Sequence, residues 1–334
     1  MIFQLLMQQG WMSPDMKRIF RYALVMVVCW FATSANAAPM AYSVNSDGLD
    51  SATTDSLYAI DLATGIDQRK GKLFTGVSTP IDTEGLAFAP DGTLWGVDDD
   101  SLMLFPINKE TGGISFTKQV PLTGFSIGGS NDFGMTFSCD NTLYVSTVRT
   151  QSLHRVDQSN GSSQVVGSVG ALGVNISAIA AYGNPTKLYG LGNGQFQDGS
   201  TDSPNLYSID PGTGVASLIG PLGSQAGAYN QGGLAFDEFG HLYAITDRGI
   251  INNSLANLPS QILSIDLNTG KATLLGSTTE VGFESLAIAV PGSCNTDTLI
   301  PDPRIPTLSP AGRVLATLML FLAGVISLRR KFAR

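Results

Sequence analysis

The sequence predicts an all-β fold, and three features support this prediction. Charged residues make up only 14% of the 334-residue chain, too few for a coiled coil or long solvent-exposed helices. Glycine is abundant, with 38 residues, as expected for short strands joined by tight turns. A strand pattern also recurs along the chain every 43 to 56 residues. The length allows one large or two ordinary domains and excludes a small disulfide scaffold.

The charge balance is acidic, with a formal net charge of −8. Proteins that bind nucleic acid present basic surfaces that neutralise phosphates. We therefore expect no nucleic-acid partner. An acidic surface also disfavours polyanionic polysaccharides unless cations bridge them.

Residues 1–37 have the pattern of a secretory signal peptide. Basic residues after Met16 precede an apolar run over residues 22–32, and an A-x-A sequence follows. This pattern predicts cleavage by signal peptidase between Ala37 and Ala38. If translation began at Met16, the signal-peptide pattern would still be complete. A retained membrane anchor is the alternative, but the apolar run is too short to span about 30 Å of hydrocarbon as a helix.

The C-terminal region has the pattern of a second targeting signal. A proline-rich linker over residues 295–309 leads into residues 310–334, which we interpret as a transmembrane segment and a basic cytoplasmic tail. The basic residues of the tail are Arg329, Arg330, Lys331 and Arg334. Under the positive-inside rule such a tail stays in the cytoplasm, so the chain before it faces the other side of the membrane.

The linker ends in a specific motif, made of Ile305, Pro306, Thr307, Leu308 and Ser309, with Gly312 shortly after. Followed by the apolar run and the basic tail, the motif closely resembles the IPTL-CTERM sorting signal of Gram-negative bacteria, with Ala311 where the commonest form has an aromatic residue. The resemblance implies recognition by an exosortase-type transpeptidase, removal of the tail, and delivery of the body to the cell surface or extracellular matrix. Before processing, the body would be anchored in the inner membrane and face the periplasm. A plain single-pass anchor is the alternative.

The cysteine content is compatible with export. Cys29 lies in the predicted signal peptide, which leaves Cys139 and Cys294 in the mature chain. Both follow inner-strand patterns, and disulfides persist outside the cytoplasm. A disulfide between them and two free thiols are both compatible with the sequence.

The body of the chain consists of repeats. Apolar phrases of similar composition mark the first strand of each repeat and begin at Gly85, Gly134, Ser177, Gly233 and Ser285. A second strand follows each of the first four phrases, whereas the partner of the fifth is found near the N-terminus, from Ala41. Third strands are identified from Ser56, His154, Asn205 and Gln261, with none identified between residues 99 and 118. Shorter fourth strands follow, and Asp-x-x-Thr-Gly-like turns supply residues that tolerate positive φ.

Four strand signals in a repeat of this length indicate the blade of a β-propeller. We therefore predict a β-propeller over residues 38–294, with five four-stranded blades. Pairing of residues 284–290 with the strands of residues 41–74 would close the ring and remove its free edges. Six or seven blades are the alternative, with the additional blade in residues 119–131 or 193–203. The turns resemble those of quinoprotein, NHL and WD40-like propellers, without the full fingerprint of one family.

Candidate functional residues gather where the inner strands begin, at one mouth of the predicted channel. The aligned position holds Glu84, Phe133, Ile176, Gly232 and Glu284, preceded by Asp82, Asp132, Asn175, Asn230 and Gln231. Carboxylate and carbonyl oxygens suit Ca²⁺, so the candidate metal ligands are Glu84, Asp132, Asn175 and Glu284, and Ca²⁺ is the candidate cofactor. Alternatively, Glu84, Asp132 and Glu284 could act as catalytic carboxylates on a sugar. The simplest interpretation is that these residues cap strands and keep the mouth solvated.

Two other groups are assigned structural roles. Asp98–Asp100 is interpreted as a solvated loop, with a second metal site as the alternative. His154 and His241 are the only histidines and belong to different blades, so neither a zinc site nor a histidine-based triad is proposed. His241 is interpreted as part of the core.

Two functions remain compatible with these patterns. The first is an exported, non-catalytic propeller that binds a glycan or protein or serves as a matrix component. The second is an exported hydrolase, lactonase-like or glycosidase-like, that uses a metal or a carboxylate pair at the channel mouth. The lack of a convergent catalytic set in the sequence favours the first.

Overall fold

The computed structural model describes residues 38–73, 82–125, 131–196, 198–252 and 254–288. The predicted signal peptide, Cys294, the sorting motif, the apolar run and the basic tail lie outside these residues. Within the described residues, no helix is long and apolar enough to cross a membrane. The chain divides into the units Met1–Ala38 and Pro39–Arg334, and the description below concerns the second.

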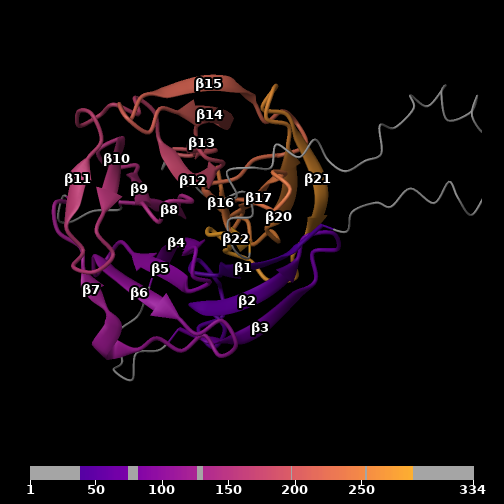
Figure 1. Ribbon diagram of the computed structural model, residues 1–334. Helices are drawn as coiled ribbons and strands as arrows, with labels where there is room; N and C mark the ends of the chain where they lie inside the picture. Colours follow the sequence, from indigo (N-terminus) through magenta and orange to yellow (C-terminus); the bar gives the residue numbers. More distant parts are fainter. Residues whose placement is uncertain (1–37, 74–81, 126–130, 197, 253, 289–334) are drawn as a thin grey trace, which may run out of the picture. The chain divides into compact units, whose positions relative to one another are not determined.

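This unit is a β-propeller of five four-stranded antiparallel blades, which confirms the predicted fold class and blade number for the described residues (Figure 1). Blade 1 contains, from the axis outward, β22 (Ala287–Ile288), β1 (Met40–Val44), β2 (Ser56–Asp61) and β3 (Asp67–Lys72). Blade 2 contains β4 (Thr83–Phe88), β5 (Leu94–Asp98), β6 (Met103–Ile107) and β7 (Val120–Pro121), with a short 3₁₀ helix, Phe116–Lys118, between the last two.

The other three blades repeat this order. Blade 3 contains β8 (Phe133–Phe137), β9 (Leu143–Thr147), β10 (Ser152–Val156) and β11 (Ser163–Val165). Blade 4 contains β12 (Ile176–Tyr182), β13 (Lys187–Gly192), β14 (Asn205–Ile209) and β15 (Ala216–Pro221). Blade 5 contains β16 (Gly232–Phe236), β17 (Leu242–Thr246), β20 (Gln261–Ile265) and β21 (Ala272–Ser277).

The ring closes by pairing the two ends of the repeat region, as the repeats predict. β22 pairs antiparallel with β1, with Tyr42 opposite Ala287. The hydroxyl of Ser285 accepts the backbone N–H of Val44 at 3.2 Å, and the hydroxyl of Ser43 donates to the carbonyl of Ser285. Residues from opposite ends of the chain therefore complete one sheet, which leaves blade 1 without a free inner edge.

Apolar side chains pack between neighbouring blades. One cluster joins Leu86 and Phe105 of blade 2 to Leu57 of blade 1, and another joins Val97 of blade 2 to Phe133 of blade 3. Similar clusters lie between blades 3 and 4 and between blades 4 and 5. Since one four-stranded sheet cannot bury both of its faces, each blade depends on its neighbours for a core.

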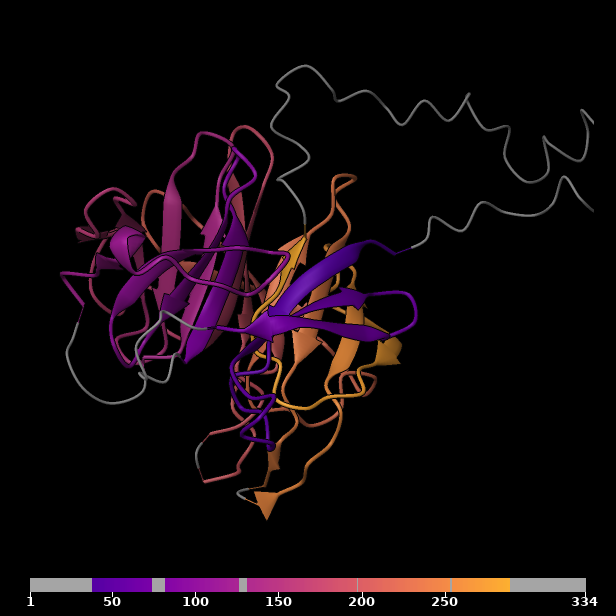
Figure 2. The same cartoon turned by 90° about the horizontal axis from the view of Figure 1, so that it is seen from below.

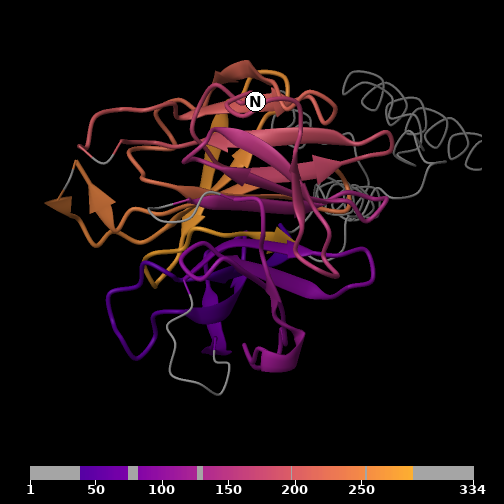
Figure 3. The ribbon, with the colours of Figure 1, turned by 90° about the vertical axis from the view of Figure 1, so that its left-hand side faces the viewer.

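Two regions suggested as sites of an additional blade have other roles. Residues 119–131 include β7, the outer strand of blade 2, and residues 193–203 form the β13–β14 loop, which holds the Gln195–Thr201 bridge. Two elements were not anticipated from the repeats. These are β6 and a two-stranded ribbon of β18 (Ile250–Ile251) and β19 (Ser254–Leu255), inserted in blade 5 and seen projecting from the ring in Figure 3.

Candidate functional site

Antiparallel pairing brings two sets of residues to the same end of the propeller. Inner strands begin at this end and second strands finish there, so residues before β4, β8, β12, β16 and β22 meet residues after β1, β5, β9, β13 and β17. We call this end the mouth. The carboxylates of one half of the mouth are Asp47, Asp82, Glu84, Asp98, Asp99, Asp132, Asp247 and Glu284.

Three of these carboxylates form a group between blades 1 and 5. Oxygen atoms of Asp47, Asp247 and Glu284 lie within 4.8 Å of one another. Glu284 is only 2% exposed, and neither of its carboxylate oxygens accepts a hydrogen bond from a described donor. Asp247 is fully buried, and its Oδ1 accepts the N–H of Gly249 at 3.0 Å. The group therefore offers closely spaced oxygens that the protein does not satisfy.

A second group lies at the start of blade 2. Oxygen atoms of Asp82, Glu84 and Asp99 also lie within 4.8 Å of one another. Asp99 accepts the N–H groups of Asn131 and Asp132 at 2.9 and 3.2 Å. This contact links blade 2 to the start of blade 3, where Asp132 has a positive φ of 42°, a conformation that Asp tolerates better than most residues.

The adjacent aspartates of blade 2 are buried, so their interpretation as a solvated loop was wrong for two of the three. Asp98 is 1% and Asp99 is 6% exposed, whereas Asp100 is exposed. Asp98 accepts the N–H groups of Asp82 at 3.2 Å and of Ser101 at 2.8 Å. Backbone donors hold these side chains in the mouth, which accounts for their burial.

The two groups meet at Glu84 and Glu284, which line the same small space below the mouth. Burial raises the pKa of both carboxyls well above the usual range, and neighbouring carboxylates, Asp132 for Glu84 and Glu84 for Glu284, raise it further. Burial is also the main reason that the pKa is raised to about 7 for Asp82 and Asp247. Burial and the repulsion between neighbouring carboxylates therefore favour the protonated form of these carboxyl groups.

Basic side chains do not compensate this charge. None of the carboxylates of Asp47, Asp82, Glu84, Asp99, Asp247 and Glu284 forms an ion pair with a described lysine or arginine. A buried carboxylate without a cation or donor is costly, so such a group binds either a proton or a metal ion.

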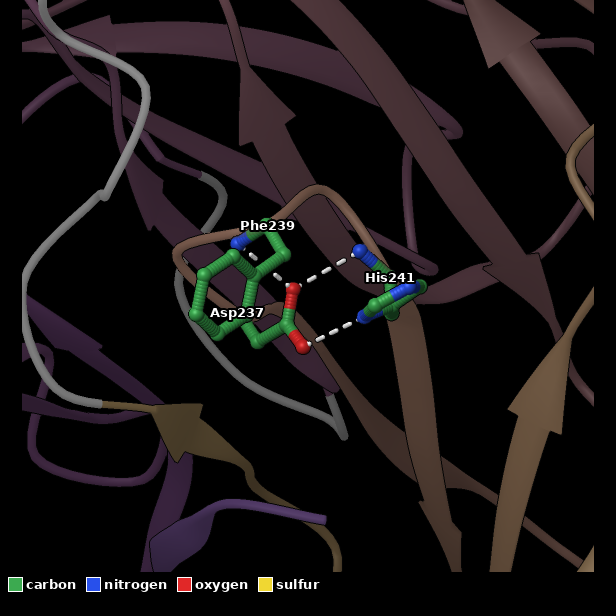
Figure 4. A network of polar contacts seen from close by, with 3 residues as sticks. All are labelled: Asp237, Phe239 and His241. Atoms are coloured by element: carbon green, nitrogen blue, oxygen red, sulfur yellow. Dashed lines mark hydrogen bonds and ion pairs between the residues drawn. The ribbon is translucent and has the colours of Figure 1, made fainter. Parts of the chain in front are cut away.

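An ion pair lies away from the mouth, in the β16–β17 turn (Figure 4). His241 Nδ1 lies 2.8 Å from Asp237 Oδ2, and Asp237 Oδ1 accepts the N–H groups of Phe239 and His241. The His241 side chain is 47% exposed, which corrects its assignment to the core. His154 is 3% exposed and stacks on Phe125 with ring centroids 4.3 Å apart.

The other half of the mouth is rich in amide side chains. A hollow of about 490 Å³ is lined there by Asn175, Asn193, Gln195, Asn230 and Gln231, with Asp132 at its border with the carboxylates. The Asn175 amide donates to Asp202 at 2.7 Å and accepts from Gln151 at 3.0 Å. We call this hollow the amide pocket.

The channel below the mouth is nearly filled. The five inner strands leave only about 10 Å³ between them, next to Glu84 and Glu284, which is room for about one water molecule. A Cβ at Gly85 would lie 2.8 Å from Met135, and one at Gly233 would lie 2.3 Å from the backbone of Leu286. The mouth is therefore a closed basin rather than the entrance to an open pore.

The residues expected from the sequence occupy different parts of this basin. Glu84 and Glu284 come together, and Asp132 lies near enough to Glu84 to raise its pKa, whereas Asn175 lines the amide pocket. Asp47 and Asp247 were missed as site residues, whereas Asp99 was considered only in the alternative of a second metal site at Asp98–Asp100. A sequence signal existed for Asp99 and Asp247, because they occupy the same repeat position, directly after the second strand.

Cys139 lies in the β8–β9 turn and is disulfide-bonded. The described residues do not include Cys294. Pairing of these two cysteines stays a prediction.

Comparisons with known proteins add little to this picture. No protein-family model matches the chain, and no curated protein matches it. Among solved structures, virginiamycin B lyase from Staphylococcus aureus is 15% identical, with a TM-score of 0.39 over 72% of this chain and 71% of that one. A protein of unknown function from Bacteroides caccae is 10% identical, with a TM-score of 0.44 over 75% and 99%.

A nidogen/laminin complex contains a chain 13% identical to this one, with a TM-score of 0.43 over 77% of this chain and 99% of that one. Values this low carry no argument about function. The fold assignment rests on the strand pairing of this chain itself.

Proposed function

We propose that this protein is an exported, non-catalytic binding propeller that holds a Ca²⁺ ion at its mouth. The observation that supports this most directly is Glu284, a 2% exposed carboxylate whose oxygens accept no hydrogen bond from a described donor. It faces Asp47 and Asp247 at metal-ligand spacing. A bound cation would supply the positive charge that these side chains lack.

Calcium fits this donor set better than a softer metal. All the side chains of the group offer oxygen, and no described histidine or cysteine belongs to it. Ca²⁺ takes six to eight oxygen ligands in flexible geometry, whereas zinc prefers nitrogen and sulfur. Neighbouring Glu84 would contribute further negative charge to the same ion.

Glycoside hydrolysis is a weaker interpretation of the same residues. Glu84 and Glu284 line the same small space below the mouth. Retaining glycosidases separate their two carboxyl groups by about 5 Å and inverting ones by about 6.5 Å or more. The inner strands leave only about 10 Å³ next to Glu84 and Glu284, which is too little for a sugar ring between the two groups.

The proposed export, processing and location of the protein rest on the sequence. The signal-peptide pattern supports export and cleavage by signal peptidase after Ala37. The motif from Ile305 to Ser309 supports processing by an exosortase-type enzyme, after which the propeller would reside at the cell surface or in the extracellular matrix. A glycan or protein would be its ligand there.

A calcium titration of thermal stability tests the metal site. A ligand that binds only the folded state at a hundredfold excess over its Kd stabilises the protein by about 2.7 kcal/mol, which corresponds to a rise in Tm of about 5–10 °C for a domain of this size. We expect such a rise for the wild type and none for Glu284→Gln.

Two further variants complete the titration. Asp47→Asn alters the exposed member of the group, so it should fold normally and weaken the calcium response. Glu238→Gln makes the same chemical change as Glu284→Gln in an exposed turn at the other end of the propeller, and it should keep the full response. A wild type that shows no rise, or an unchanged rise in Glu284→Gln and Asp47→Asn, would refute the proposed site.

A further inference from the structure

The amide pocket has a lining that selects for a particular chemistry. Five amide side chains, from loops of blades 4 and 5, contribute to its wall, and none of the described lining residues is basic. Each amide offers both a donor and an acceptor. A pocket for an apolar molecule is mostly hydrophobic, so this one fits a ligand that carries many hydroxyl groups.

Two of the amides have hydrogen-bonding capacity that the protein does not use. Oδ1 of Asn193 and Oε1 of Gln231 are enclosed, and no described donor reaches either oxygen. Buried polar atoms are normally satisfied. Two residues of the lining therefore carry amide oxygens that no described protein donor satisfies.

The pocket is held in place by contacts between separate elements. Gln195 accepts the N–H of Asn252 at 2.8 Å, which ties the β13–β14 loop to the β18–β19 ribbon. Figure 2 shows this loop (pink) and the ribbon (orange) projecting side by side from the same side of the ring. Asn175 is fixed by Gln151 and Asp202, as described above. A wall organised before binding loses less entropy when a ligand arrives.

An aromatic side chain stands at the edge of the pocket. Phe196 belongs to the lining and is 47% exposed, unusual for a large apolar residue in a polar hollow. Its ring can cover the C–H face of a sugar ring while the amides bind the hydroxyl groups. The volume of about 490 Å³ falls within the range of about 300–1,000 Å³ usual for small-ligand sites.

Charge narrows the ligand class further. The pocket borders the carboxylate groups at Asp132, and Asp198 and Asp202 also line it. These acidic side chains repel anions, and no basic residue of the lining would bind one. We propose that the amide pocket binds a neutral carbohydrate. This inference rests on the proposed binding function of the mouth and names its ligand class.

Calorimetric titration of the purified full-length protein tests the inference. The probes are cellohexaose, mannohexaose, xylohexaose and maltohexaose, with an anionic hexaguluronate for comparison, each measured with calcium and with EDTA. We expect at least one neutral oligosaccharide to bind and hexaguluronate not to bind. Phe196→Ala and Asn230→Ala should each weaken that binding at least tenfold, and Phe196→Trp should largely preserve it.

Phe239→Ala is the matched control, because Phe239 is 64% exposed in the β16–β17 turn, away from the pocket (Figure 4). It should bind the oligosaccharide like the wild type. Absence of binding to all four neutral probes, binding of hexaguluronate alone, or equal affinity in Phe196→Ala and the wild type would overturn the inference.

The same protein samples distinguish this inference from the metal site. A wild-type protein that shows the calcium response of Tm but binds no neutral oligosaccharide would overturn the carbohydrate pocket alone. Binding of a neutral oligosaccharide without any calcium response would support the pocket and refute the metal site.

Discussion

His154 shows how burial determines the pH response of one side chain. The residue is 3% exposed in β10, stacks on Phe125, and has the hydroxyl of Ser163 3.3 Å from its Nδ1. Burial disfavours the charged imidazolium and lowers the pKa of His154 from 6.5 to about 4. The folded state therefore requires a neutral ring at pH values where the unfolded chain already binds a proton.

The sign of the pH effect follows from this shift. The stability contributed by neutral His154 is complete above pH 6.5 and is lost as the pH falls toward 4. The full effect amounts to about 3 kcal/mol. Replacing His154 with Gln should flatten the dependence of Tm on pH between 6.5 and 4, measured by differential scanning calorimetry. If the slope of Tm against pH is unchanged in His154→Gln, another titratable group determines the pH dependence of stability in this range.

The turn between the third and fourth strands is a repeated element that connects blades. In each blade an Asp or Asn side chain accepts a backbone N–H two residues later, and a glycine with positive φ follows. These glycines are Gly65, Gly112, Gly161, Gly214 and Gly270. Each packs on backbone of the preceding blade, where a Cβ would lie within 2.5 Å of a carbonyl oxygen.

Gly270→Ala should measure the importance of this contact. Its φ is +74°, and a Cβ would lie 2.3 Å from the carbonyl oxygen of Gly220. Gly92 is the matched control, because its φ is +85° and a Cβ there would meet nothing within 4 Å. Gly92→Ala should lose only the conformational term of about 1 kcal/mol, and Gly270→Ala about 3 kcal/mol or more.

Chemical denaturation of both variants gives the comparison. Equal losses of free energy of unfolding in Gly270→Ala and Gly92→Ala would mean that the approach between blades adds nothing to the conformational cost.

Closure of the ring is a property of the whole propeller, and Ser285 tests it. Its hydroxyl accepts the N–H of Val44 at the junction of the two chain ends. Ser285→Ala leaves this buried N–H without its side-chain partner, which should cost about 1–3 kcal/mol. Ser177 occupies the equivalent position of blade 4, but its buried hydroxyl has no hydrogen-bond partner among the described residues.

Ser177→Ala should therefore be nearly neutral or slightly stabilising, since it removes an unsatisfied polar group. Urea unfolding of the two variants provides the measurement. If Ser177→Ala lowers the free energy of unfolding as much as Ser285→Ala does, the hydroxyl at this position stabilises the inner strand for a reason other than ring closure.

The two ends of the propeller differ in chemistry. The mouth gathers carboxylates and amides, whereas the opposite end of the channel has a small hollow lined by residues such as Phe88, Phe236 and Ile288. This difference follows from the repeat, because the polar positions precede the inner strands and the apolar ones finish them. The gathering of polar side chains at one end is therefore built into the repeat.

Much of the fold was predictable from the sequence because its signals are local. Turn residues and alternating apolar positions mark strands wherever they occur, and the unpaired fifth inner strand predicted the closure between residues 41–74 and 284–290. β6 was missed, because the long segment between it and β7 hides the usual spacing. The β18–β19 ribbon was missed because its short, exposed strands interrupt blade 5 without repeating elsewhere.

The sequence by itself determined the repeats, the turns and the end of the channel at which polar residues gather, since each depends on residues near one another in the chain. It predicted five blades with six or seven as the alternative, and the strand pairing decided for five. Only the tertiary structure decided that Asp47 and Asp247 join Glu284, that Glu84 meets Glu284, and that amides of two blades line one pocket. Neighbouring blades bring these groups together from distant parts of the chain, and the lack of basic partners among the described residues becomes visible only when all the surrounding residues are in place.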